Sequence, residues 1–179
     1  MTKKYGEHIT NPRRAVPRLQ EMIRWGRKID NMINGAKFDL NSWWSVGESG
    51  YAPPEPPRST STASDCGFSG CLAGWCALNP KFRKNGLRLT RGLLDITAEG
   101  SEYEGIESTF LALAKFFGIS YCAAEAVFGS TSIDWQEGAS IDADIDYRVA
   151  RLDPHDPSQA VARAIRFCES QGIEIPEEE

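Results

Sequence analysis

Apolar residues recur at helical spacing through much of the chain and predict a series of helices. Leu19, Met22, Ile23, Ile29 and Ile33 fall on one face of a helix that begins near Pro17 and ends at Asn34 and Gly35. Further helices are expected over 66–78, 106–117 and 121–128, and from 157 to about 171. Gly118 and Gly172 follow two of them, and Ser120 and Asp156 precede two as N-caps.

Alternating apolar and polar positions predict a small amount of β-structure. The aromatic segment 37–46 fits a strand or a tight turn better than a helix. Leu87, Leu89, Leu94 and Ile96 alternate with polar residues and indicate a minor β-hairpin. Residues 140–152 fit both a strand and a helix, and we favour the helix because acids lie in its first turn and arginines in its last.

These elements predict a mainly α protein with one compact helical domain over 15–172. Proline and serine dominate residues 47–65, which we expect to form a long loop. Residues 1–14 are expected to be a flexible basic arm, and 173–179 a solvated acidic tail.

Charge divides the chain into a basic front and an acidic back. The whole protein has a formal net charge of −5, with +5 over residues 1–40, +3 over 41–94 and −13 over 95–179. Attraction between the two oppositely charged parts can help the fold to close. Alternatively, the basic part can bind an anionic ligand or the acidic part a basic partner protein.

Five cysteines, an odd number without a disulfide pattern, indicate reduced thiols in a cytoplasmic protein. No apolar run approaches the roughly 20 residues that cross a bilayer, so we expect no membrane contact. The first residues have no apolar segment of a secretory signal.

The segment 65–77, with sequence DCGFSGCLAGWCA, combines three cysteines, three glycines and a tryptophan. Its small residues allow close packing, and the N-terminus of a helix attracts anions. We therefore predict a ligand or partner site where this helix meets an aromatic pair and two arginines of the first helix. Its expected members are Arg24, Arg27, Trp43, Trp44, Asp65, Cys66, Gly67, Cys71 and Trp75.

Two other functional classes remain open. Cys66 or Cys71 is a candidate nucleophile of a cysteine-dependent enzyme, with His8 or His155 as the base. Residues 111–120 resemble the turn of DNA-binding helix-turn-helix proteins, but the following helix has no Lys or Arg and carries Glu125, so nucleic-acid binding is the weaker alternative.

Neither a metal nor a cofactor is expected. The cysteines at 66, 71 and 76 are five residues apart, whereas zinc ligands are usually two to four apart. Asp142, Asp144 and Asp146 start like a calcium loop, but Tyr147 stands where that loop needs glycine.

Three motifs together resemble a family of small uncharacterised proteins of phages, prophages and bacteria. They are F-D-L-x-x-W-W at 38–44, C-G-x-x-x-C-L-A-G-W at 66–75 and F-G-I-S-x-x-x-A-x-x-V-F at 117–128. Trp75 stands where histidine is common in that family. The resemblance implies a viral, mobile-element setting, in the cytoplasm of the host cell. We therefore expect a non-enzymatic accessory protein that binds a host protein or a small anionic ligand and counters host defence.

Overall fold

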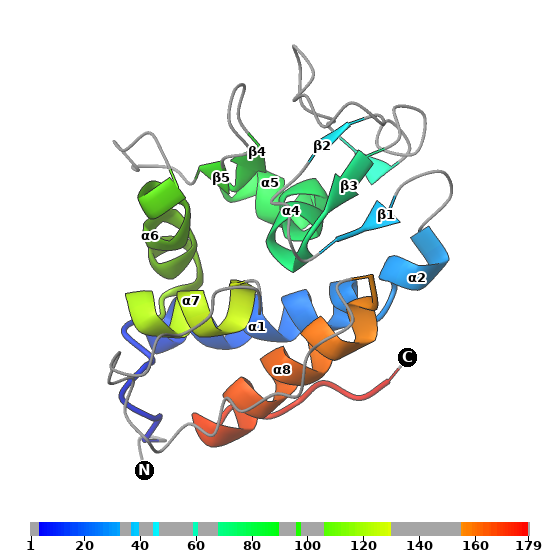
Figure 1. Cartoon of the computed structure of the whole chain (residues 1–179). Helices are drawn as coiled ribbons and strands as arrows, with labels where there is room; N and C mark the ends of the chain where they lie inside the picture. Colours follow the sequence, from blue (N-terminus) through cyan, green and yellow to red (C-terminus); the bar gives the residue numbers. More distant parts are fainter. Residues whose placement is uncertain are drawn as a thin grey trace, which may run out of the picture.

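The computed structural model describes residues 4–32, 37–39, 45–46, 59–60, 68–89, 96–97, 106–129 and 155–178. Within these residues the protein is mainly helical, as predicted (Figure 1). The helices are α1 (Pro12–Gly26), α2 (Ile29–Met32), α4 (Leu72–Leu78), α5 (Pro80–Lys84), α6 (Ile106–Phe117), α7 (Tyr121–Phe128) and α8 (Pro157–Ser170). None of these described helices has the length and apolarity needed to span a bilayer.

Five short strands form two small sheets within the described residues. In the first sheet β3 (Phe68–Gly70) lies between β1 (Lys37–Phe38), which is parallel to it, and β2 (Ser45–Val46), which is antiparallel. In the second, β4 (Arg88–Leu89) pairs antiparallel with β5 (Ile96–Thr97), with Leu89 opposite Ile96. This pair confirms the predicted minor hairpin.

The start of α4 corrects the prediction of one helix over 66–78. Residues 68–70 are a strand, and the helix begins only at Leu72, after Cys71 in an extended conformation. Pairing with a strand on each side supplies backbone partners for β3 that a helix would otherwise have provided. All seven residues of α4 are buried, so the expected burial of this helix is confirmed.

The first helix also differs from its predicted bounds. It begins at Pro12, because the Asn11 side chain accepts a hydrogen bond from the Arg14 amide and caps the helix there. It ends at Gly26, and a turn at Arg27 separates it from α2, so the predicted helix to Ile33 is interrupted.

Helix α5 was not predicted, whereas α7 and α8 follow their predicted caps closely. Ser120 caps α7 through its hydroxyl, which accepts from the Ala123 amide, and Asp156 caps α8 through Ser158. The expected helix over 140–152 and the loop over 47–65 lie almost entirely outside the described residues.

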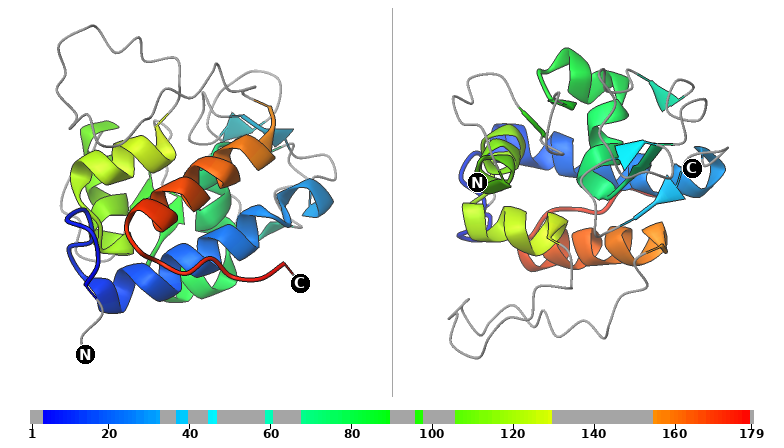
Figure 2. Two further views of the ribbon diagram at one scale, coloured as in Figure 1. Left: turned by 90° about the horizontal axis from the view of Figure 1, so that it is seen from below. Right: turned by 45° about the horizontal axis from the view of Figure 1, so that its top comes forward.

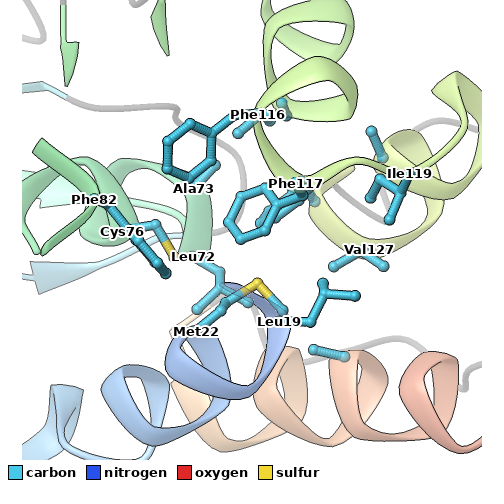
Figure 3. Close-up of a cluster of buried hydrophobic side chains, with 14 of the residues drawn as sticks. Leu19, Met22, Leu72, Ala73, Cys76, Phe82, Phe116, Phe117, Ile119 and Val127 are labelled. Atoms are coloured by element: carbon cyan, nitrogen blue, oxygen red, sulfur yellow. The ribbon is translucent and has the colours of Figure 1, made fainter. Parts of the chain in front are cut away.

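Helix α1 runs through the molecule and contacts α4, α6 and α8 (Figures 1 and 2). Leu19 and Met22 project from it into an apolar cluster that α4, α5, α6 and α7 complete. Figure 3 shows this cluster, with Leu72, Ala73, Cys76, Phe82, Phe116, Phe117, Ile119 and Val127 around the two α1 side chains.

The segments before α1 and after α8 contact the helical body, although the sequence suggested an arm and a tail. The amides of Thr10 and Asn11 donate to the Gly118 carbonyl, at 3.0 and 2.9 Å, and Ile9 pairs with Ile119. Residues 173–178, called the strap below, run back along α1 (Figure 2, left).

Two glycines with positive φ reverse the chain at these contacts. Gly118 (φ 69°) ends α6, and Gly172 (φ 71°) ends α8. After Gly172 the Ile173 amide donates to the Cys168 carbonyl at 2.8 Å, and the Gly172 amide donates to the Glu169 carbonyl at 3.0 Å. This is a Schellman motif, and it sends the strap back toward α1.

We predict that Gly118→Ala destabilises the protein more than Gly172→Ala. Both changes force alanine into the left-handed region, at a cost of about 1–2 kcal/mol. At Gly118 the new Cβ would also lie 2.8 Å from the Asn11 carbonyl oxygen, whereas at Gly172 the nearest atom would be 3.9 Å away. Urea unfolding of both variants measures the difference, and equal losses would contradict the close packing at Gly118.

Candidate binding groove between α1 and α8

A groove of about 720 Å³ lies beside the end of α1, along α2 and α8. Its basic side comes from Arg24, Arg27 and Lys28. Its apolar surface comes from α8, α2 and one glycine of α1, namely Val161, Ala162, Ile165, Met32 and Gly26. Ser158, Asp30, Asn31, Glu177 and Glu178 complete the lining.

Gly26 is the residue that brings the two helices together at this groove. A Cβ on Gly26 would lie 2.5 Å from Cγ2 of Val161 in α8 and 3.5 Å from Cδ1 of Leu72 in α4. Because real Cβ atoms do not approach other carbons to 2.5 Å, only glycine fits between the helices without a shift of Val161. The close contact between α1 and α8 beside the groove thus depends on a residue without a side chain.

The strap borders the groove and makes polar contacts with α1 and with Arg27, the residue that follows this helix. Nη1 of Arg27 donates to the carbonyl of Pro176 at 2.7 Å and to that of Glu177 at 3.4 Å. Nε of Arg27 lies 3.7 Å from Oε1 of Glu178. About two helical turns before Arg27, Nε2 of Gln20 donates to the Glu174 carbonyl at 2.9 Å.

Charges in the groove balance only because of the strap. The lining contains three cations (Arg24, Arg27 and Lys28) and three acids (Asp30, Glu177 and Glu178). Two of those acids belong to the strap, so without it the same lining would have three cations and one acid. The surface beneath the strap is therefore basic.

The structure separates the residues that the sequence analysis grouped into one site. Arg24 and Arg27 line the groove, whereas Cys71 and Trp75 are buried in the core at 2% and 0% exposure. Trp75 contributes its carbonyl, which accepts from Nε1 of Trp25 at 2.8 Å. Other expected members lie outside the described residues, namely Trp43, Trp44, Asp65, Cys66 and Gly67.

Burial makes the described core thiols poor nucleophiles. It raises the pKa of Cys71 to about 11, although amides of α4 and the Arg163 guanidinium oppose the rise. It raises the pKa of Cys168 to about 12 and that of Cys76 well above its usual value. A thiol that reacts as a thiolate near neutral pH needs the opposite shift.

Both histidines make contacts that hold segments together. Nδ1 of His8 lies 3.0 Å from the Ser120 hydroxyl, where it ties the first residues to the cap of α7. Nδ1 of His155 lies 3.3 Å from the Phe38 carbonyl. Across the described residues no three His, Cys, Asp or Glu side chains gather in a cluster that could hold a metal ion.

Comparisons with protein-family models, curated proteins and solved structures found no match. The resemblance to the phage family therefore stays a prediction, and the groove itself carries the functional argument.

The groove partners of the two arginines were not apparent from the sequence. Lys28 follows them at once in sequence, and the α8 side chains are ordinary members of an amphipathic helix. The strap had a signal of its own, since Ile173 and Ile175 alternate with glutamates as in an extended segment with one face buried.

We predict that alkylation distinguishes the described thiols by exposure. Cys122 is exposed, whereas Cys71, Cys76 and Cys168 are buried. Iodoacetamide at pH 8 should modify Cys122 in the native protein and reach the three buried thiols only in denaturant. Burial keeps the reagent away from these thiols, and their raised pKa values keep them protonated. Peptide mass spectrometry measures this order. Rapid native modification of Cys71 would contradict the packing around α4.

Proposed function

We propose that this chain is a non-catalytic binding protein whose α1–α8 groove binds an extended acidic segment of a partner protein. In the phage setting that the resemblance implies, the partner is a host protein, and its capture counters a host defence. The observation that carries the proposal is the contact between the basic side of the groove and the chain's own acidic strap.

The strap illustrates the chemistry that this surface accepts. Arg27 donates to two successive backbone carbonyls and lies near a carboxylate, so it recognises both an extended backbone and its charge. A guanidinium suits this task because its donors are planar and fixed in direction. An acidic segment of another protein offers the same carbonyls and carboxylates.

Size and surface of the groove also favour a peptide. Its volume of about 720 Å³ lies within the usual range for ligand sites. Val161, Ala162 and Ile165 give it an apolar strip on α8, while Arg24 and Lys28 add charge on the α1 side. Apolar contact gives affinity to a bound segment, and the cations select acidic side chains.

The same contacts favour a binding role over the two alternatives. Cys71 is buried, with its pKa raised to about 11, which does not suit a cysteine enzyme. Helix α7 carries Glu125 and no cation, which does not suit contact with a nucleic-acid backbone.

We predict that a rhodamine-labelled, amidated peptide IEIPEE binds the full chain, and that Arg24→Ala with Lys28→Ala weakens it. Loss of two groove cations should raise Kd about 2- to 30-fold, because partly exposed charge pairs are each worth about 0.2–1 kcal/mol. Fluorescence anisotropy at low and high salt measures the affinity. The effect should shrink at 1 M salt, since screening weakens exposed charges.

Two controls make the test specific to the groove. Arg13→Ala with Arg14→Ala removes the same charge from the exposed start of α1, outside the groove lining, and should leave Kd nearly unchanged. The neutral peptide IQIPQQ should bind weakly to every variant. Equal weakening by both double variants would indicate a diffuse charge effect, and binding of free glutamate as tight as that of the peptide would indicate a small-anion site; either result would overturn the proposal.

A further inference from the structure

We infer that the strap is an autoinhibitory segment, which occupies the basic side of the groove and must leave it before an acidic segment of the partner can bind. This inference rests on the proposed function and adds its regulation. It follows from where the strap lies, from what holds it and from the charge that it covers.

The strap occupies the site of the proposed ligand. Glu177 and Glu178 are themselves part of the groove lining, and Arg27 is engaged with the strap through Nη1 and Nε. A partner segment that used Arg27 in the same way would need the same donors. The strap and the partner therefore compete for one guanidinium.

The strap is held by two buried residues, Ile173 and Pro176, and its last described residues are exposed. Ile173 is buried at 3% exposure and directly follows the Schellman turn of α8, so the strap is anchored at its beginning. Farther along, the side chain of Glu178 is 85% exposed and lies 3.7 Å from Arg27. Such an exposed ion pair contributes little to stability. Release of the acidic end therefore breaks the Arg27 contacts and uncovers Pro176, while Ile173 stays in the core.

Release of the strap changes the charge of the groove. With the strap in place the lining has equal numbers of cations and acids, and removal of Glu177 and Glu178 leaves Arg24, Arg27 and Lys28 against Asp30 alone. An acidic segment is attracted more strongly in the second state. The strap thus limits binding to partners that match its acidity and replace its contacts.

Anisotropy titrations of the IEIPEE peptide against two kinds of strap variant test this inference. Glu177→Gln with Glu178→Gln removes the competing charge, whereas Gln20→Ala removes the bond to the Glu174 carbonyl without any change of charge or of groove lining. Each change should lower Kd about 2- to 10-fold, since each removes contacts of the strength of an exposed pair or a single hydrogen bond. Glu125→Gln with Glu169→Gln is the matched charge control on α7 and α8, outside the groove lining, and should leave Kd unchanged.

The outcomes separate this inference from the proposed function. Tighter binding in both strap variants, dependent on Arg24, supports competition. Arg24-dependent binding with unchanged Kd in the Gln20→Ala variant overturns the inference and leaves the proposed function standing, because a weaker hold on the strap then does not help the peptide to bind. No Arg24-dependent binding in any variant overturns both.

Discussion

Contact between α1 and α8 at Gly26 determines where the rest of the structure can lie. A Cβ at this position would meet Val161 at 2.5 Å and Leu72 at 3.5 Å, so α1, α4 and α8 converge on one glycine. The apolar side chains of α1 belong to the core, and Gly26 itself lines the groove. Because protein interiors are close-packed, a side chain at position 26 would have to displace Val161 of α8.

Local signals predicted the elements whose ends are set by their own residues. Gly118, Ser120, Asp156 and Gly172 end or cap α6, α7 and α8, and each acts through hydrogen bonds within a few positions in the chain. The strand at 68–70 was missed because its partners lie at 37–38 and 45–46, and pairing at that separation leaves little trace in the segment itself.

The candidate site was predicted only in its arginines. Arg24 and Arg27 lie at the groove because they fall on one side of α1, which helical spacing shows. Cysteine and glycine in α4 suggested a reactive or ligand-binding site, but the same small residues also suit a helix in the core. The burial of all of α4 favours the packing role. The strap escaped prediction because acidic segments are most often solvated, while this one is bound by Arg27 from a distant part of the chain.

The central claim is that one groove holds the strap in the free protein and an acidic partner segment in the bound one. Its most direct test is a titration of the ¹⁵N-labelled full chain with unlabelled IEIPEE peptide, followed by amide chemical shifts. The account predicts coupled shifts at Arg24, Lys28 and Ala162 of the groove and at Glu177 and Glu178 of the strap. Peptide binding with shifts confined to α6 and α7, or with groove shifts while the strap amides stay unchanged, would contradict it.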